Sequence, residues 1–303
     1  MDKIDFTGRV AIVTGAGGGL GRLHALALAE RGAKVVVNDL GGAVDGSGGS
    51  ATAAQKVVDE IKARGGEAIA NGASVTDFDA VQAMVQQAID TWGRVDILVN
   101  NAGILRDKSF GKMELADFRL VLDVHLMGAV HLCKAAWPHM VAQKYGRIVL
   151  TTSSTGLYGN FGQANYGAAK MALVGLMQTL SIEGVKSDIR VNCLAPTAAT
   201  RMTEGLLPPE VLAALRPEAV VPAMLVAVSA QAPTRTVFAA GAGTYEVAHV
   251  TLTQGVHLGL SPDTPERLLA ALPQITERLG ETVPMSGAEQ GTNEVTKALA
   301  ARR

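Results

Sequence analysis

Short apolar runs alternate along the chain with longer segments in which apolar residues recur at helical spacing. The short runs predict buried strands, since they are rich in β-branched residues and end at glycine or polar residues. They cover residues 9–14, 34–38, 67–71, 95–100, 147–152 and 189–194. The intervening helices cover residues 20–31, 51–64, 77–91, 115–143 and 165–185. This alternation predicts an α/β fold built on a parallel sheet with right-handed crossovers.

The pattern changes after Pro208. Residues 217–229 have the periodicity of a helix, and residues 237–241, 244–252 and 254–260 that of short strands. Two amphipathic helices are predicted at residues 264–279 and 288–300. Fewer than 50 residues follow Gly255, which is little chain for a separate core. We therefore expect one domain over residues 1–255, with residues 256–303 as a helical extension packed on it.

One face of the extension needs a partner surface. Apolar residues recur at helical spacing within it, namely Leu268, Leu269, Leu272, Ile275 and Leu279. In an open α/β sheet the ligand crevice lies beyond the carboxyl ends of the strands, and the chain that follows the last strand can cover it. The opposite edge of the sheet and a subunit interface are the alternatives.

Composition excludes several classes of protein. The 27 Lys and Arg balance 28 Asp and Glu, for a net charge of -1, so we expect no surface for nucleic acid. Two cysteines, Cys133 and Cys193, form neither a disulfide framework nor a metal site and suggest a reducing compartment. No apolar run approaches the ~18 residues of a membrane span, and neither end carries a targeting signal. These features predict a cytoplasmic protein.

Glycines gather where the first strand meets the first helix. Gly15, Gly19 and Gly21 lie in the string TGAGGGLG, with Leu20 at the start of the helix. Glycine lets the backbone approach a pyrophosphate, and a helix N-terminus offers free N–H groups to the anion. The alternative is a flexible turn. Because the loop follows a strand and opens a helix, a dinucleotide site is the favoured interpretation.

Asp39 ends the second strand, 18 residues after Gly21. A carboxylate at this place can accept hydrogen bonds from the adenosine ribose hydroxyls. It would also repel a 2′-phosphate, and the neighbouring residues supply no arginine to offset the repulsion. We therefore expect NAD rather than NADP, although a turn or N-cap aspartate is the alternative.

Three further residues suggest acid–base chemistry. Tyr166 and Lys170 are four apart in a predicted helix, so they share a face, and an ammonium near a phenol lowers its pKa. Ser153 ends a strand 13 residues earlier, where it could hydrogen-bond a substrate carbonyl. Taken singly, the pair could be an ordinary surface pair and the serine an ordinary strand-end residue.

Together these motifs resemble the short-chain dehydrogenase/reductase family, over about residues 6–255. The resemblance rests on the glycine loop, the string NNAG at residues 100–103, and Ser153, Tyr166 and Lys170 in order. It implies a Rossmann-type doubly wound sheet in a single domain and hydride transfer at a nicotinamide. Tyr166 would be the acid–base group, Lys170 would assist it, and Ser153 would orient the substrate.

The resemblance also implies further cofactor contacts. Ser74 and Val75 would flank the adenine, although Ser74 stands where many relatives have Asp. The nicotinamide-side ribose and the carboxamide would contact Asn101, Ala102, Gly103, Pro196 and Thr200, with Tyr166 and Lys170 also against the cofactor. His125 stands where relatives often have Asn, and either holds a proton-relay water or only packs. No metal is expected, because His131 and His139 lack partner carboxylates at ligand spacing.

Longer strings resemble one branch, the dehydrogenase unit of the peroxisomal multifunctional enzyme type two. They are NDLGG at residues 38–42, NNAGILRDKSF at 100–110, KYGRI at 144–148, GLYGNFGQANY at 156–166 and RMT at 201–203. The branch implies oxidation of (3R)-hydroxyacyl-CoA thioesters, and its members carry His at position 125. That unit normally shares a chain with a hydratase domain, so a free-standing version is expected here. The alternatives are a 17β-hydroxysteroid dehydrogenase, a 3-oxoacyl carrier-protein reductase and a non-catalytic dinucleotide-sensing regulator.

The helices predict self-association. The segment after Gly167 is apolar on most sides, with Ala168, Ala169, Met171, Ala172, Leu173, Val174, Leu176 and Met177 nearly in succession. A helix of this kind must be covered on most sides. We expect a homodimer or homotetramer through residues 115–143 and 165–185, and the family resemblance implies the same.

Overall fold

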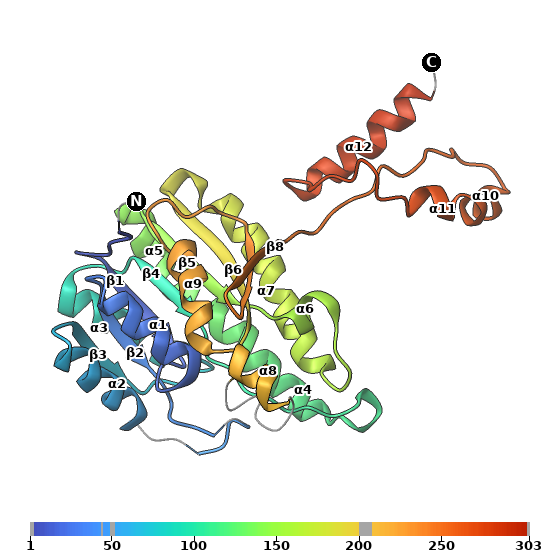
Figure 1. Cartoon of the computed structure of the whole chain (residues 1–303). Helices are drawn as coiled ribbons and strands as arrows, with labels where there is room; N and C mark the ends of the chain where they lie inside the picture. The colour runs from blue at the N-terminus through green and yellow to red at the C-terminus, as the bar shows by residue number, and fades with distance from the viewer. Residues whose placement is uncertain (1–2, 44, 49–51, 200–207, 302–303) are drawn as a thin grey trace. The chain divides into compact units, whose positions relative to one another are not determined.

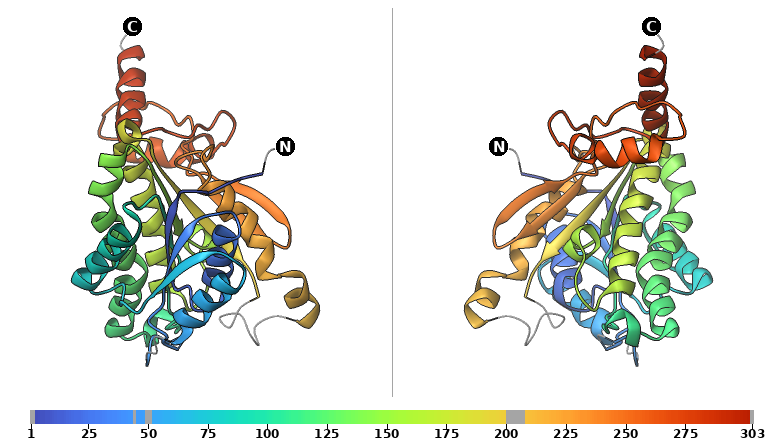
Figure 2. Two further views of the ribbon diagram at one scale, coloured as in Figure 1. Left: turned by 90° about the vertical axis from the view of Figure 1, so that its left-hand side faces the viewer. Right: turned by 90° about the vertical axis from the view of Figure 1, so that its right-hand side faces the viewer.

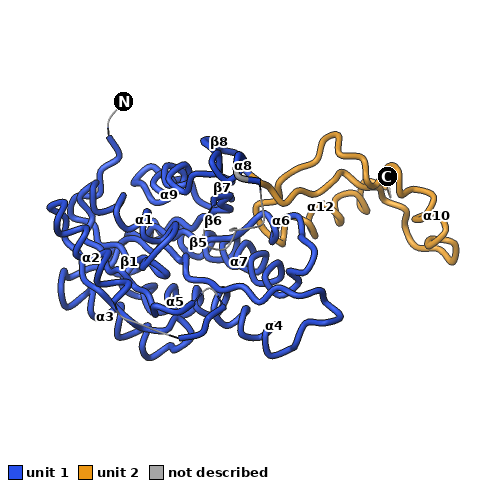
Figure 3. Tube along the Cα trace, turned by 60° about the horizontal axis from the view of Figure 1, so that its bottom comes forward, with its two compact units in different colours: residues 1–247 blue, residues 248–303 orange. Residues whose placement is uncertain are grey.

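The computed structural model describes residues 3–43, 45–48, 52–199 and 208–301. They divide into two compact units, residues 1–247 and residues 248–303 (Figure 3). The division falls close to the boundary expected at residue 255.

An eight-stranded sheet organises the first unit, in the order β3-β2-β1-β4-β5-β6-β7-β8. The strands are β1 (Val10–Thr14), β2 (Lys34–Asn38), β3 (Glu67–Asn71), β4 (Ile97–Asn100), β5 (Gly146–Thr151), β6 (Ile189–Thr197), β7 (Val237–Gly241) and β8 (Thr244–Ala248). Pairing is parallel from β3 through β7. The chain moves outward from β1 in one direction to β2 and β3, then restarts on the other side with β4. Ligands of open α/β sheets bind at such a switch point.

Helices cover both faces of the sheet, as the predicted crossovers require (Figures 1 and 2). One face carries α1 (Gly19–Ala29), α2 (Thr52–Ala63) and α9 (Val221–Ala227). The other carries α3 (Phe78–Trp92), α5 (Gly128–Gln143) and α7 (Ala164–Glu183). Shorter helices are α6 (Ser154–Tyr158) and α8 (Pro209–Ala214). The doubly wound α/β prediction is confirmed.

The predicted helix over residues 115–143 is continuous but irregular. It comprises α4 (Leu115–Leu122), a π-helical turn at Asp123–Met127 and α5. By length and composition alone this stretch could cross a membrane, with a mean hydropathy of 1.2 in its most apolar window. Its buried residues, including Leu132 and Met140, pack toward the sheet and α3, as in the core helix of a globular domain.

Two predictions for the second unit are wrong. Residues 254–260 form no strand, because Gly255 and Gly259 adopt φ of 59° and 69°, outside the extended region. The helix predicted over 264–279 is broken into α10 (Thr264–Ala270) and α11 (Leu272–Ile275), since Pro273 has no N–H to continue a helix. The unit also contains α12 (Gly287–Ala300) and an isolated antiparallel bridge between Leu252 and Thr282. None of its described residues is buried.

Candidate active site

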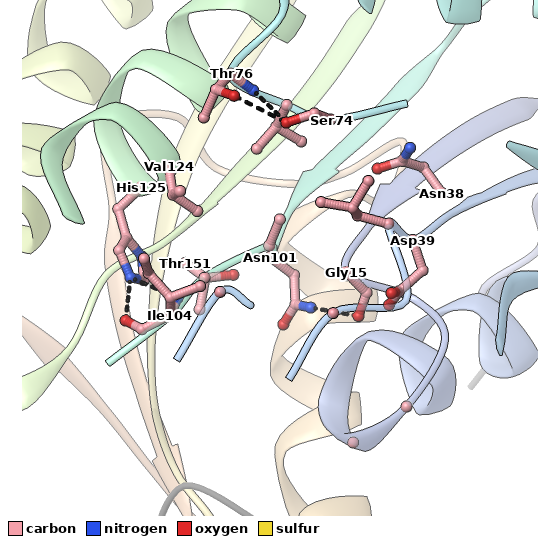
Figure 4. Close-up of a pocket in the computed structure, with 18 of the residues that line it drawn as sticks. Gly15, Asn38, Asp39, Ser74, Thr76, Asn101, Ile104, Val124, His125 and Thr151 are labelled. Atoms are coloured by element: carbon pink, nitrogen blue, oxygen red, sulfur yellow. Dashed lines mark hydrogen bonds between the residues drawn. The ribbon is translucent and has the colours of Figure 1, made fainter. Parts of the chain in front are cut away.

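A cavity of about 390 Å³ opens at the carboxyl ends of the strands, at the switch point between β1 and β4. Its lining includes thirteen residues predicted from the sequence: Gly15, Gly19, Leu20, Asp39, Ser74, Val75, Asn101, Ala102, Gly103, His125, Tyr166, Lys170 and Pro196 (Figure 4). Gly21 lies against the loop, and Ser153 lies beside Tyr166. Thr200 and the string at 201–203 lie outside the described residues.

Close backbone contacts explain the glycines of the first loop. Gly15 has φ of 63°, and a Cβ there would lie 2.8 Å from the Cα of Ala102. At Gly21 a Cβ would lie 2.1 Å from the carbonyl oxygen of Gly15. The Asn101 amide donates to the carbonyls of Thr14 and Gly15 at 3.0 and 3.1 Å, which ties the loop to the end of β4 (Figure 4).

The N-terminus of α1 points its free backbone donors toward this loop. No side chain caps the helix at Gly18, and no acidic residue lies in its first turn. Uncapped N–H groups and the positive end of the helix dipole favour an anion such as a pyrophosphate. The loop and the cavity beside it therefore fit a dinucleotide.

Asp39 has a local role as well as a candidate ligand role. Its two carboxylate oxygens accept hydrogen bonds from the N–H groups of Gly17 and Gly41, at 2.7 and 2.6 Å. The carboxylate thus holds the glycine loop against the end of β2. This is the role of a turn aspartate, which was the alternative to ribose binding expected from the sequence. Each oxygen retains a second lone pair, so the same side chain can still accept from ribose hydroxyls.

The sequence pattern did not predict that the segment after β2 forms one wall of the cavity. This wall is lined by Leu40, Gly42, Ala43 and Gly46, although the glycine-rich string to which they belong indicated only a loop. The Arg106 side chain donates to the carbonyl of Asp45 at 2.7 Å and so connects this wall to the segment after β4. The sequence contains no pattern that predicts this contact, since Asp45 and Arg106 are 61 residues apart.

Tyr166 and Lys170 line one end of the cavity, and Ser153 lies beside Tyr166. Ser153 caps α6, accepting from the N–H of Thr155 at 3.1 Å, and its hydroxyl lies near the Tyr166 phenol, where it favours the ionised form. Lys170 is buried, its Nζ donates to the carbonyl of Thr151 at 2.5 Å, and it lies 5.4 Å from the centre of the Tyr166 ring. The spacing of four residues on α7 therefore does place both side chains on one face.

Burial sets the proton affinities of this group. It raises the pKa of Tyr166 and lowers the pKa of Lys170 to about 7. The first direction is opposite to the one expected from the Tyr–Lys pair. The reason is that burial of the phenol itself has the largest effect on its pKa and outweighs the opposing contribution of the Ser153 hydroxyl.

His125 lies in the π-helical turn, buried and edge-on to Tyr166 with 5.2 Å between ring centres. Its Nε2 contacts the backbone N and O of Ile104 at 3.1 and 2.8 Å (Figure 4). A Cβ on Gly103 would come within 2.3 Å of the imidazole, so the glycine of NNAG makes room for this ring. Burial and the charge of Lys170 lower the pKa of His125 well below its usual value, so the ring is neutral.

A second cavity of about 10 Å³, large enough for about one water, adjoins His125 and Lys170. Thr14, Asn100 and Thr151 complete its polar lining. Among the described residues, the His125 Nδ1 and Thr151 Oγ1 atoms are buried with no protein partner. Thr151 was not predicted; its only signal is its place at the end of β5, two residues before Ser153.

The arrangement can transfer a proton and hold an oxygen. The Tyr166 phenol, the Lys170 amine and the neutral His125 imidazole line the main cavity, the last two also line the small one, and the Ser153 hydroxyl lies beside the phenol. Such a chain suits the addition or removal of a proton at a substrate oxygen, with the dinucleotide loop at the other end of the cavity.

Comparison with known proteins agrees with this geometry. The sequence model of the family described as short chain dehydrogenase matches residues 9–210. Peroxisomal multifunctional enzyme A of Dictyostelium discoideum is 50% identical over 94% of this chain and 64% of its own length. Peroxisomal multifunctional enzyme type 2 of Mus musculus is 54% identical over 73% of this chain and 30% of its own. The chain thus spans less than two thirds of these curated relatives.

Solved structures give the same result. A short chain dehydrogenase from Mycobacterium avium matches with a TM-score of 0.78 and 40% identity, over 90% of this chain and 97% of that one. Full-length peroxisomal multifunctional enzyme type 2 from Drosophila melanogaster matches with a TM-score of 0.80 and 36% identity, over 98% of this chain and 50% of that one. A 7α-hydroxysteroid dehydrogenase in complex with NADH matches with a TM-score of 0.72 and 31% identity, over 80% of this chain and 98% of that one.

The predicted cytoplasmic location is wrong by this comparison. The matching enzymes of Dictyostelium, mouse and Drosophila are all named peroxisomal. Polar ends and reduced cysteines fit either compartment, so composition could not distinguish them.

Proposed function

The chain belongs to the short chain dehydrogenase family, and from that premise we propose that it oxidises (3R)-hydroxyacyl-CoA thioesters to 3-ketoacyl-CoA with NAD. The observation that carries the proposal is the convergence of Ser153, Tyr166 and Lys170 at one end of a cavity whose other end is the glycine loop. The match to peroxisomal multifunctional enzymes over 94% and 98% of this chain supports the branch of the family from which the sequence strings imply this substrate class.

NAD would lie between the glycine loop and Lys170, with Asp39 toward the adenosine ribose and Asn101 to Gly103 toward the nicotinamide end. When bound, it supplies the hydride acceptor. Asp39 supports NAD over NADP, because its carboxylate would meet a 2′-phosphate with like charge. The hydroxysteroid dehydrogenase structure that contains NADH supports the same coenzyme class.

The residues of this chain divide the work of proton transfer. Ser153 donates a hydrogen bond to the substrate oxygen and holds it against Tyr166. The ionised phenolic oxygen of Tyr166 accepts the hydroxyl proton and becomes neutral, and Lys170 stabilises the tyrosinate before the transfer. Burial makes both groups responsive to their neighbours, because neither can rely on water to stabilise its charge.

We assign the small cavity to a water that carries the proton onward from Lys170. His125 and Thr151 support this role, since each presents a buried atom without a protein partner and both line the cavity. This favours the water-holding alternative for His125 over packing alone. The π-helical turn supports it further, as such turns are frequent at functional sites.

Assembly and the second unit complete the proposal. A homodimer or homotetramer would cover apolar side chains such as Met171 and Ile182, which are 40% and 51% exposed on α7. Light scattering that shows a monomer at micromolar concentration would contradict this assembly.

Residues 256–303 would cover the substrate end of the crevice, since Leu268 and Leu269 are exposed within their own unit.

A panel of alcohols tests the reaction. We expect NADH formation from (3R)-hydroxyacyl-CoA, little from the (3S) epimer and less from 17β-hydroxysteroids. Selective turnover of a steroid would favour the second candidate function, which the matched hydroxysteroid dehydrogenase supports. Turnover only of carrier-protein thioesters with NADPH, or binding of NAD without turnover of any alcohol, would refute the proposal.

A further inference from the structure

The segment after β4 is hydrogen-bonded along its length to the segment that carries the catalytic serine and tyrosine. Arg106 offers its carbonyl to the buried amide of Asn165 at 3.0 Å, and the Lys108 N–H donates to the carbonyl of Gly162 at 2.9 Å. Between them, the Asp107 carboxylate accepts from the Gln163 amide nitrogen at 2.6 Å. Residues 104–108 therefore run alongside the start of α7.

Gln163 connects three parts of the site through one amide. Its nitrogen donates to Asp107, while its oxygen accepts from the hydroxyl of Thr155 at 2.9 Å and the amide of Asn160 at 3.1 Å. Thr155 is two residues from Ser153, and Gln163 is three residues from Tyr166. The amide thus fixes the separation of these two catalytic residues against Asp107.

We propose that Asp107 is a positioning residue for the acid–base group: held by Gln163, its carboxylate fixes residues 104–108 across the start of α7 and directs a negative charge at Tyr166. The inference rests on the proposed role of Tyr166. Burial is the main cause that raises the Tyr166 pKa, and the negative charge of the exposed Asp107 acts in the same direction.

None of the other described groups around Tyr166 carries a negative charge that would oppose ionisation of its phenol. Lys170 lies over the ring from α7, the neutral His125 lies edge-on from the π-helical turn, and the uncharged Ser153 approaches from the end of β5. The neighbouring part of α4 and the turn after it contribute apolar side chains, Leu120, Val121, Leu122 and Val124. The Arg106 guanidinium turns away to Asp117 and Asp45. Among these groups, Asp107 therefore supplies the negative charge that acts on the phenol.

Asp107→Asn separates charge from contact. The amide oxygen can still accept from Gln163, but the negative charge is gone. We expect the acidic limb of the pH profile of kcat/KM for alcohol oxidation to move to lower pH by a few tenths of a unit, or roughly the effect of one charge in a solvent-exposed setting. Glu114→Gln is the matched control, since it removes an exposed carboxylate from the N-cap of α4 and should leave the profile unchanged.

Asp107→Ala and Gln163→Leu test the contact. Each should lower kcat on the order of 3- to 10-fold, the typical net effect of losing one hydrogen bond. The double variant should lose little more than Gln163→Leu alone, because that substitution already breaks the contact with Asp107 together with those to Thr155 and Asn160. An acidic limb that stays in place in Asp107→Asn, or fully additive losses in the double variant, would overturn the inference. Failure of the proposed function is distinct, since Tyr166→Phe would then keep its activity.

Discussion

At the scale of single residues, the site depends on close approaches that leave no room for another atom. Gly103 faces the His125 ring, and Gly15 and Gly21 enclose the loop between β1 and α1. Asp39 has a structural role and a proposed binding role. Its carboxylate accepts hydrogen bonds from two backbone N–H groups, and it would also face the adenosine ribose of the coenzyme. A sequence shows which residue stands at such a place, but the neighbour that requires it comes from far along the chain.

Asp39→Asn should narrow the preference for NAD over NADP. The amide oxygen can still accept one backbone N–H, so the loop keeps much of its shape, while the charge that repels a 2′-phosphate is removed. The measurement is kcat/KM with both coenzymes for the native protein and the variant. Equal or better native efficiency with NADP would contradict the assignment of the coenzyme.

Thr151→Val should slow turnover and leave KM nearly unchanged. Valine has the shape of threonine without the hydroxyl, so the variant removes one candidate ligand of the relay water, at a cost of about 5-fold in kcat. Thermal unfolding checks that the fold survives. If kcat is unchanged and stability rises, the hydroxyl is an unsatisfied group and holds no water.

At the scale of elements, the strands and crossover helices could be predicted because their period follows from burial on a sheet. The irregular turns could not. The π-helical turn at Asp123–Met127 keeps the apolar spacing of a long helix, and α6 has only five residues. The residues proposed for catalysis could be predicted from their spacing together with the family resemblance, whereas Thr151 and Asp107 could not, since only the fold brings them near Tyr166.

Helix α1 carries a buried titratable group that makes stability depend on pH. His24 is fully buried with no partner for either ring nitrogen among the described residues, and burial lowers its pKa to about 4. The unfolded chain binds a proton below about pH 6.5, while the folded chain does not until about pH 4. Stability should therefore fall as the pH drops through this window.

Urea unfolding at pH 7 and pH 5 measures the effect. One such histidine predicts a loss of about 2 kcal/mol over this interval. His125, whose pKa is lowered in the same direction, adds to it. His24→Leu should remove the share due to His24. A variant with the same pH dependence as the native protein would show that His24 titrates normally in the folded state.

At the scale of the whole molecule, the second unit cannot be stable through its own core. None of its described residues is buried, and Leu260 and Leu279 are 101% and 84% exposed. A unit of this size with so little internal packing needs a partner surface. The substrate crevice, the opposite sheet edge and a subunit interface remain the three expectations for it.

Truncation after Ser261 distinguishes a role of the second unit at the substrate crevice from a purely structural role. If the unit covers the crevice, KM for the thioester should rise while NAD still binds. If it is structural, thermal stability and solubility should fall and KM should stay constant. Kinetics and stability that both match the full chain would refute each role.

The rate of NADH formation from a (3R)-hydroxyacyl-CoA, compared between the native protein and Tyr166→Phe, tests the central claim most directly. Phenylalanine keeps the ring and removes the phenolic oxygen, so NAD binding, checked by fluorescence titration, should persist. Loss of the acid–base group predicts a rate at least ~10²-fold lower. A variant that oxidises the thioester at a near-native rate would mean that another group takes the proton, and the account of this site would be wrong.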